Sequence, residues 1–377
     1  MLSCGEASGD LYAGALAAEL RQREPSVEVF GMGGQGLAGG GGRVVADFHS
    51  LSVTGLTEMV RVIPRSYATL RRLVAEAERV RPDVFVAIDF PDFNFRLMRA
   101  IHALGIPVVY YVSPQLWAWR PGRMETMKRY VDTVLVLFPF EQPLYEQAGV
   151  AVEFVGHPLV DLAHATQTRA GFLGGLGLTA DAPTVALLPG SRPNELHRLT
   201  PVILEAVPAI RAQVPGVQFV VACAPTLGDE HFQPFAAAGL ALARDRSDDV
   251  LAWSDVVITA SGTATVQAAL HRRPMVVVYK LSPVSYAIGK PLVTVSMYAM
   301  PNLVAGRRIV TELIQEGCTP SAITRETVSL LTDPQRHAEM RGALDEVAAR
   351  LGGAGASGRA ADAVLRVARR EGSNGAR

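Results

Sequence analysis

The sequence has few cysteines and no excess of either charge. Its three cysteines, Cys4, Cys223 and Cys318, lie far apart and form no C-x-x-C pair. This spacing argues against a disulfide framework and a structural zinc site, and it suits a reducing cytoplasm. Lys plus Arg and Asp plus Glu each total 36 of the 377 residues. No global field therefore attracts nucleic acid or another polyanion.

The sequence also lacks a long apolar segment. Even the uncharged run 291–306 is shorter than a membrane-spanning helix, and it contains Pro301 and Asn302. No charged and then apolar leader precedes the first motif, so we expect no signal peptide. A hydrophobic content of 49% with 19% charged residues is typical of a folded protein with a sizeable core. We therefore expect a protein that is soluble or peripheral to a membrane.

Glycine is abundant in one segment, 31–42, behind a strand-like stretch. Gly31, Gly33 and Gly36 fall on the G-x-G-x-x-G spacing that holds a dinucleotide pyrophosphate. That motif needs a helix directly after its last glycine, whereas Gly36 is followed by Leu, Ala and four more glycines. Because each glycine costs a helix about 1 kcal/mol, we expect no helix here. A flexible glycine loop is therefore favoured over a nicotinamide or flavin site.

Short apolar runs alternate with helical patterns twice along the chain. The runs are almost continuously apolar, as parallel strands buried on both faces should be. In the first half we expect strands at 27–30, 84–88, 108–112, 133–137 and 152–155. In the second half we expect strands at 184–188, 217–222, 240–243, 256–259 and 275–278. Two such series predict an α/β fold with two doubly wound, Rossmann-like domains facing a ligand cleft.

The change from one series to the next predicts the domain boundaries. Pro158 ends the first series, so we expect an N-terminal domain at 1–158 and a second domain at 159–335. Two apolar stripes in 336–377 predict two C-terminal helices, separated by the glycines of 352–358. We expect these helices to pack back on the N-terminal half.

Two polar segments of the first half are candidate ligand sites. GEASGDLYAG, 5–14, precedes a helix, so its free amides at Ser8, Gly9 and Asp10 are candidates for ligand contact. Alternatively, Ser8 or Asp10 only caps that helix. DFPDFN, 89–94, brings two carboxylates and an amide to a strand end, where a general base would be well placed. Alternatively, one of these residues only forms the turn.

Aromatic side chains follow the next expected strand of the first half. YYVSPQLWAWRPGR, 110–123, contains Trp117 and Trp119, flanked by Arg120 and Arg123. Such a group suits stacking on a sugar face or lining an acyl pocket. Packing of the two tryptophans beneath a loop explains the pattern equally well.

Two segments of the second half suit a nucleotide diphosphate. ALLPGSRPNE presents Ser191, Arg192 and Glu195 after a strand, and arginine binds phosphate in a bidentate manner. VVITASGTATVQAAL follows a strand with the hydroxyls and amides of 261–263 and then a helix. Two such sites without metal ligands indicate a nucleotide-sugar donor.

In order, these motifs resemble those of the lipid-A-disaccharide synthases. The matching segments are GEASGD, DFPDFN, YYVSPQLWAWR, GHP, LLPGSR with Glu195, SGTAT, and PNLVAG at 301–306. The resemblance implies an inverting glycosyltransferase of the glycosyltransferase-B type, without cofactor or metal. It implies transfer of 2,3-diacylglucosamine from UDP to 2,3-diacylglucosamine 1-phosphate, giving a β-1,6 disaccharide and UDP. It also implies a cytoplasmic enzyme, peripheral on the inner face of the inner membrane.

The resemblance also assigns roles to residues. It implies that Asp89 is the catalytic base and that Arg192 and Asn302 are further essential groups of the site. The residues implied to bind substrate are Glu6, Ser8, Gly9, Asp10, Asp92, Asn94, Ser191, Glu195, Ser261, Gly262, Thr263 and Gln267.

The sequence departs from the family pattern at two places. Only four residues precede GEASGD, where the family usually has a full strand, and Gln267 replaces an acid that often binds the ribose. Because glutamine still donates and accepts hydrogen bonds, we expect weaker UDP contact there rather than its loss. Three alternatives remain. The protein could be another UDP-sugar transferase, such as a peptidoglycan N-acetylglucosaminyltransferase, or a UDP-sugar epimerase, or a non-catalytic nucleotide-sugar-binding scaffold. Whether it forms a homodimer is left open.

One further segment, 51–65, suggests a membrane contact. Val53, Leu56, Val60 and Ile63 form an apolar helical stripe, and two arginines, at 61 and 65, accompany it. Arg71 and Arg72 follow. This combination suits the surface of an anionic bilayer, although an ordinary core-facing helix gives the same pattern. Charge reversal of Arg61 and Arg65 is expected to weaken binding to anionic vesicles.

Overall fold

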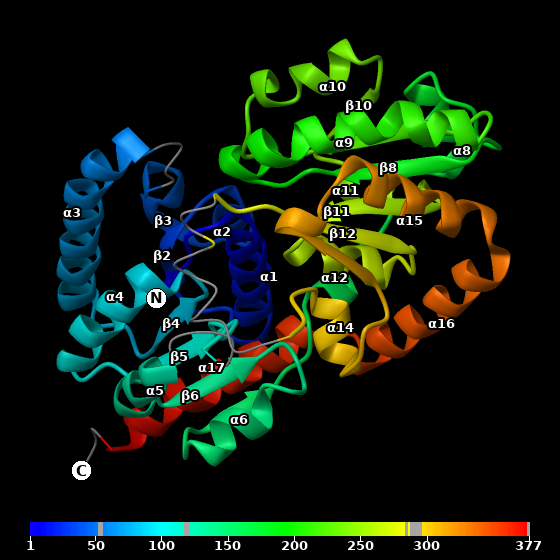
Figure 1. Ribbon diagram of the computed structural model, residues 1–377. Helices are drawn as coiled ribbons and strands as arrows, with labels where there is room; N and C mark the ends of the chain where they lie inside the picture. The colour runs from blue at the N-terminus through cyan, green and yellow to red at the C-terminus, as the bar shows by residue number, and fades with distance from the viewer. Residues whose placement is uncertain (52–55, 117–120, 283–285, 287–295, 375–377) are drawn as a thin grey trace. The chain divides into compact units, whose positions relative to one another are not determined.

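The computed structural model describes residues 1–51, 56–116, 121–282, 286 and 296–374. This part forms two compact units, each built on a parallel sheet with alternating helices (Figure 1). Unit 1 comprises residues 1–158 and 351–377, and unit 2 comprises residues 159–350. The expected α/β class with two doubly wound domains is confirmed.

Unit 1 contains a seven-stranded parallel sheet with strand order β3-β2-β1-β4-β5-β6-β7. Its strands are β1 (Leu2–Ser3), β2 (Phe30–Gly33), β3 (Arg43–Asp47), β4 (Phe85–Ile88), β5 (Val108–Tyr111), β6 (Thr133–Val136) and β7 (Val152–Phe154). β1 has two residues but pairs with β2 on one side and β4 on the other. The short segment before GEASGD therefore still provides a central strand.

Seven helices and two short 3-10 turns connect or cover this sheet in the described part of unit 1. The helices are α1 (Ala7–Arg23), α2 (Gln35–Gly39), α3 (Leu56–Val80), α4 (Pro91–Ala103), α5 (Met124–Tyr130), α6 (Gln142–Gln147) and α17 (Ala356–Asn374). The turns are η1 (Phe48–Leu51) and η2 (Pro121–Arg123). Leu97, Met98 and Ile101 of α4 are fully buried in a core with the side chains of β4 and β5.

Unit 2 contains a six-stranded parallel sheet with strand order β10-β9-β8-β11-β12-β13. Its strands are β8 (Thr184–Leu188), β9 (Gln218–Cys223), β10 (Ala241–Arg244), β11 (Val256–Ala260), β12 (Met275–Tyr279) and β13 (Thr311–Ile314). Its described helices are α7 (Leu159–Leu162), α8 (Arg169–Gly175), α9 (Pro193–Gln213), α10 (Gln233–Ala237), α11 (Ser247–Trp253), α12 (Thr263–Leu270), α14 (Met300–Ala305), α15 (Pro320–Thr332) and α16 (Pro334–Arg350), with turns η3 (Asp229–His231) and η5 (Gln315–Gly317). The order matches the Rossmann order in both sheets, with β7 added in unit 1.

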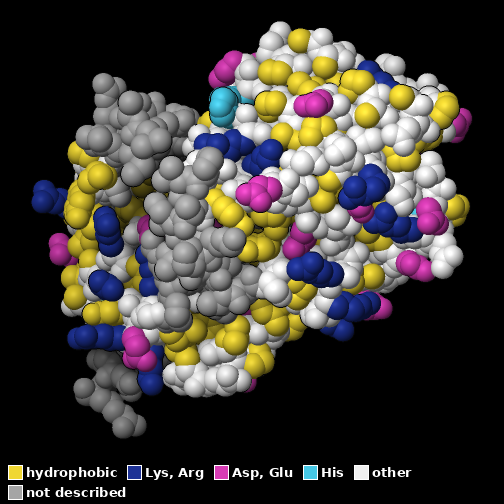
Figure 2. All heavy atoms as spheres, in the orientation of Figure 1, with side chains coloured by type: hydrophobic (Ala, Val, Ile, Leu, Met, Phe, Trp, Pro, Cys, Tyr) yellow, Lys and Arg dark blue, Asp and Glu magenta, His cyan; other side chains and the backbone are white. Residues whose placement is uncertain are grey.

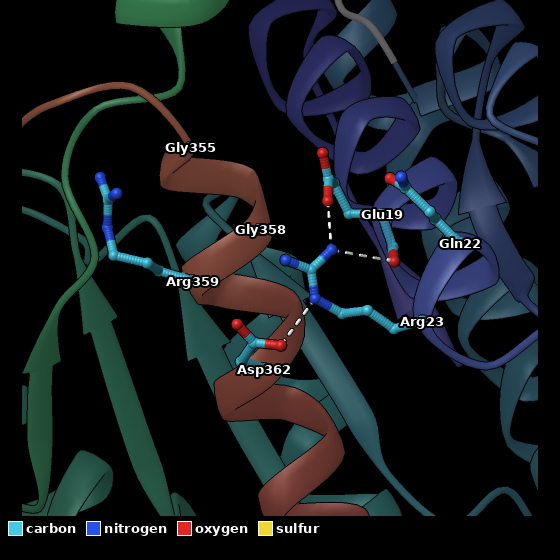
Figure 3. Close-up of a pocket in the computed structure, with 7 residues that line it drawn as sticks. All are labelled: Glu19, Gln22, Arg23, Gly355, Gly358, Arg359 and Asp362. Atoms are coloured by element: carbon cyan, nitrogen blue, oxygen red, sulfur yellow. Dashed lines mark hydrogen bonds and ion pairs between the residues drawn. The ribbon is translucent and has the colours of Figure 1, made fainter.

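The two C-terminal helices belong to different units. α16 packs on α12, α14 and α15 of unit 2, whereas α17 packs on α1 of unit 1. There Arg23 of α1 pairs with Glu19 and with Asp362 of α17, beside a surface pocket between the two helices (Figure 3). The expectation that both helices pack on the N-terminal half is therefore wrong for α16, whose apolar stripe is covered by unit 2.

Four strand assignments need correction. β2 begins at Phe30, where the expected strand was to end, and β1, β3 and β13 were not among the expected strands. β3 and β13 lie at sheet edges and carry exposed or half-buried polar residues, so they lack a continuous apolar run. An edge strand is buried less completely than an interior one, which weakens its sequence signal.

Candidate active site

Each sheet has one point at which its strand order reverses, and doubly wound folds bind ligands at the carboxyl ends of the strands there. In unit 1 this switch point lies between β1 and β4, which are followed by Gly5 and Asp89. In unit 2 it lies between β8 and β11, which are followed by the segment 189–192 and Ser261. The structure thus brings predicted residues of each unit to the switch point of that unit.

Asp89 directly follows β4 in a left-handed backbone conformation. Its φ is +46°, and that of Phe90 is +48°, which non-glycine residues rarely adopt. The amide of Asp89 donates to the carbonyl of Tyr111 at 3.1 Å. Its own carbonyl accepts from Tyr110 Oη and from Asn94 Nδ2, each at 2.8 Å. Asp89 is half-buried, and both its backbone N–H and its backbone carbonyl are hydrogen-bonded.

Two buried rings, those of Tyr12 and His157, lie near this strand end. Burial, with the neighbouring Tyr111 and the negative charge of Asp89, raises the pKa of Tyr12 far above its usual value. The Tyr12 ring meets that of His157, from the GHP segment, edge to face at 5.9 Å between centroids. Burial lowers the pKa of His157 from 6.5 to about 3, so this imidazole is neutral at physiological pH. The Tyr12 ring close to Asp89 and the His157 ring against it are therefore both uncharged at physiological pH.

Asp92 and Asn94, the other polar residues of DFPDFN, differ in exposure. Asp92 lies in the first turn of α4, is 72% exposed and pairs with Arg123 at 2.5 Å. Asn94 is fully buried: its Oδ1 accepts from Ser3 Oγ at 2.7 Å, and its Nδ2 donates to the carbonyls of Ser3, Ile88 and Asp89. Asn94 therefore joins β1 to the end of β4, and the substrate contact expected of it would require breaking these bonds.

Other predicted groups of unit 1 lie at the start of α1. Glu6 occupies the N-cap position, and Ser8 and Gly9 lie in the first turn. Neither Ser8 nor Asp10 is the N-cap residue, and the Asp10 amide donates to Glu6 O. The amides of Ser8 and Gly9 belong to the first turn, where intrahelical acceptors are absent.

Asp10 instead caps a second helix. Its Oδ1 accepts from the amides of Gly34 and Leu37 at 2.6 and 3.1 Å, and its Oδ2 accepts from Gly36 at 2.7 Å. The helix is α2, so the expectation that the glycine segment forms no helix is wrong. A charged acceptor at the helix N-terminus offsets the cost of its glycines. The carboxylate also occupies the amides that a dinucleotide pyrophosphate would need, so ligand contact by Asp10 is disfavoured.

In unit 2 the segment after β8 is held by Glu195. Glu195 Oε2 accepts from the Ser191 amide at 2.9 Å, and its Oε1 pairs with Arg192 Nη1 at 3.1 Å. Gly190 has a φ of +132°, and a β-carbon there would approach Glu195 to 2.6 Å. Glu195 thus shapes the turn, whereas the Arg192 side chain is 58% exposed.

The second predicted loop of unit 2 precedes α12 as expected. Ser261 follows β11, Gly262 is the N-cap with a φ of +143°, and the helix begins at Thr263. Gly262 and Thr263 are exposed, and Ser261 Oγ donates to the carbonyl of Tyr298 at 3.4 Å. Gln267 lies half-buried in the same helix. Exposed first-turn amides of this kind suit an anion.

Asn302, expected in the site, is fully buried in α14. Its Oδ1 accepts from the amides of Ile309 and Val310, and its Nδ2 donates to Val310 O and Glu312 Oε1. Glu312 Oε1 also accepts from the amides of Tyr298 and Ala299, at 2.9 and 2.7 Å. The pair therefore holds the segment next to Ser261, and direct catalysis by Asn302 is not supported by its burial.

Several features bear on cofactors and membranes. Among the described residues, no three His, Cys, Asp or Glu side chains form a group that could hold a metal ion. Trp117, Trp119 and Arg120, the expected sugar or acyl contacts, lie outside the described residues. None of the described helices combines the length and hydrophobicity needed to cross a membrane.

Comparison with known proteins decides the family. A family model described as lipid-A-disaccharide synthetase matches residues 1–366. The lipid-A-disaccharide synthase of Myxococcus xanthus is 43% identical over 370 residues, which cover 97% of both chains. That of Geobacter metallireducens is 42% identical over 373 residues, covering 97% of this chain and 96% of that protein. The chain belongs to the lipid-A-disaccharide synthase family.

Solved structures support the fold of this lipid-A-disaccharide synthase family member. The glycosyltransferase of kitacinnamycin has a TM-score of 0.62 and 18% identity, and the match covers 97% of this chain and 98% of that one. The UDP-GlcNAc 2-epimerase of Neisseria meningitidis, solved with UDP-GlcNAc, has a TM-score of 0.66 and 13% identity, with 97% and 99% coverage. The fold is therefore that of glycosyltransferase-B enzymes.

Sequence reasoning missed two residues that shape the site of this synthase family member. Tyr110 lies in the segment YYVSPQLWAWRPGR, for which the sequence predicted no role of this tyrosine, and its hydroxyl donates to the carbonyl of Asp89. Glu312, in a strand that was not expected, is an acid that accepts three hydrogen bonds. An acid inside an otherwise apolar segment was the available signal for Glu312. Nothing in the sequence indicated the bond from Tyr110.

Proposed function

We propose that this protein transfers 2,3-diacylglucosamine from UDP to the 6-hydroxyl of 2,3-diacylglucosamine 1-phosphate. The products are the β-1,6-linked disaccharide 1-phosphate and UDP. The observation that carries the proposal is the position of Asp89 at the switch point of unit 1, in a member of the lipid-A-disaccharide synthase family. The carboxylate supplies the general base, and unit 2 supplies the anion-binding loops.

Asp89 acts on the acceptor hydroxyl. In an inverting transfer, this oxygen attacks the anomeric carbon on the side opposite UDP, and the glycosidic bond to the diphosphate breaks. A hydroxyl is a weak nucleophile, so a carboxylate must take its proton as the new bond forms. Asp92 is the alternative base, but its carboxylate pairs with Arg123 at 2.5 Å and is largely exposed. This argues for Asp89.

The donor diphosphate binds at the switch point of unit 2. Arg192 provides a charge-assisted contact, and the α12 N-terminus provides amides and the Thr263 hydroxyl. Glu195 keeps the Ser191 amide and Arg192 together, as its bonds to both indicate. Glu6, Ser8 and Gly9 remain candidates for contact with the acceptor.

The protein works as a peripheral enzyme on the cytoplasmic face of the inner membrane. Ile63 and Tyr67 are 55% and 50% exposed. They share a face of α3 with Ala77, which is buried in the core, and with Leu70 and Val74, which pack against it. The apolar face of α3 therefore continues beyond the core. Figure 2 shows basic and hydrophobic side chains beside each other on the side of unit 1 where α3 lies. Arg96 lies over the Tyr67 ring at 5.6 Å.

An assay of both products tests the proposal. The protein is incubated with UDP-2,3-diacylglucosamine, with or without 2,3-diacylglucosamine 1-phosphate, and UDP and the lipid product are measured by mass spectrometry. UDP and a disaccharide phosphate should appear only when the acceptor is present. A donor that isomerises without acceptor would indicate an epimerase instead. A protein that binds UDP but releases none would be a binding scaffold.

A further inference from the structure

The left-handed turn at Asp89 is maintained by two buried donors that act on one carbonyl. Tyr110 Oη and Asn94 Nδ2 both donate to Asp89 O at 2.8 Å. Both donor side chains are fully buried, and they come from different elements, β5 and α4. A non-glycine residue in this conformation costs about 1–3 kcal/mol, so it persists only where surrounding contacts hold it.

Each donor is itself fixed in place. The Tyr110 ring lies 6.0 Å from that of Phe95, centroid to centroid, within the core of unit 1. Burial and the nearby negative charge of Asp89 raise the pKa of Tyr110 well above its usual value, so its hydroxyl remains a donor. Asn94 is held by the hydroxyl and carbonyl of Ser3. We call the two donors, Tyr110 and Asn94, the clamp. The clamp connects Asp89 to the two neighbouring strands, because Tyr110 belongs to β5 and Asn94 is bonded to Ser3 of β1.

We propose that Tyr110 and Asn94 are positioning residues that hold the Asp89 carboxylate where it can receive the acceptor proton. Neither touches the substrate; both act on the peptide that orients the base. The proposal rests on the proposed role of Asp89 as general base. Without the clamp, the turn at 89–90 relaxes toward an ordinary backbone conformation and the carboxylate moves with it. Catalysis is sensitive to displacements of this kind.

The first variant of the test removes only the Tyr110 hydroxyl. Tyr110→Phe keeps the ring in the core and should lower kcat about threefold to tenfold, the equivalent of one hydrogen bond, with KM for both substrates unchanged. Asn94→Ser removes the other donor and should act in the same direction, so the test stands if one variant fails to fold. Tyr145→Phe is the control, because it removes another buried hydroxyl of unit 1, bonded to Ser113 Oγ at 2.5 Å, and should leave kcat unchanged.

A double-mutant cycle separates positioning from general destabilisation. If Tyr110 acts through the carboxylate, Tyr110→Phe should cause no further loss of kcat in the Asp89→Asn background. Full activity of both Tyr110→Phe and Asn94→Ser, or an equal loss in both backgrounds, would overturn the clamp. Full activity of Asp89→Asn alone would instead overturn the base assignment. The two failures are therefore distinguishable.

Discussion

Arg192 is the exposed charge that follows β8, and its contribution can be tested alone. If it binds the diphosphate, Arg192→Ala removes a charge-assisted contact of about 1.5–3 kcal/mol. UDP affinity measured by calorimetry should then fall roughly tenfold to a hundredfold. Arg325→Ala, an exposed arginine on α15, is the matched control and should bind UDP as the parent does. An Arg192→Ala protein that is folded and binds UDP normally would remove Arg192 from the diphosphate site.

His157 gives unit 1 a predictable response to acid. Its pKa is about 3 in the folded protein and 6.5 without burial, so the unfolded chain binds more protons between these values. Stability therefore falls as pH drops through 6.5. Between pH 6.5 and 5.0 this one group should remove roughly 1.5 kcal/mol from the free energy of unfolding.

The comparison variant is His157→Gln, which has no ionisable group. Urea unfolding of both proteins at the two pH values should show a smaller acid-induced loss in the variant. Equal losses in the two proteins would show that His157 is not buried in its neutral form.

For single residues, the sequence predicted which ones lie at the strand ends but not which of them are exposed. Asn94 bonds to Ser3, which lies 91 residues away, and Asp10 bonds to a loop 24 residues away. Such partners are set by the tertiary fold, which a motif does not reveal. For Asn94 a signal did exist, because it shares a helical stripe with Leu97, Met98 and Ile101 of α4, all buried.

Among the elements, α2 depends on a residue outside it. The Asp10 carboxylate accepts from three amides at the start of α2. Asp10→Asn would place an NH₂ group against at least one of these donors, so the variant should lose about 1.5–3 kcal/mol of unfolding free energy. Asp362→Asn breaks an exposed ion pair with Arg23 and should cost less than about 1 kcal/mol. Equal losses for the two variants in thermal unfolding would contradict the capping role.

Continuous apolar runs in the sequence predicted the interior strands well. The buried interior strands β8, β11 and β12 were predicted almost residue for residue, because sheets covered on both faces require continuous apolar runs. α2 was not predicted because the low helix propensity of glycine can be read from the segment itself, whereas the carboxylate that caps this helix belongs to Asp10 in α1. β1 was too short to carry a pattern of its own.

For the whole molecule, the proposed membrane contact is tested by vesicle flotation. Ile63→Glu places a charge on the exposed apolar face of α3 and should reduce the fraction that floats with anionic vesicles. Ala68→Glu adds the same charge about 140° around the helix and is the matched control. Equal flotation of the parent protein and both variants would mean that this face of α3 does not meet the bilayer.

The proposed transfer depends on Asp89 as its general base. The most direct measurement compares turnover and UDP affinity in Asp89→Asn and in Asp92→Asn, each checked for folding. We predict that Asp89→Asn loses about 10²- to 10⁴-fold in kcat while its UDP affinity stays unchanged. Near-full turnover in Asp89→Asn together with collapse in Asp92→Asn would contradict the account and assign the base to the other carboxylate.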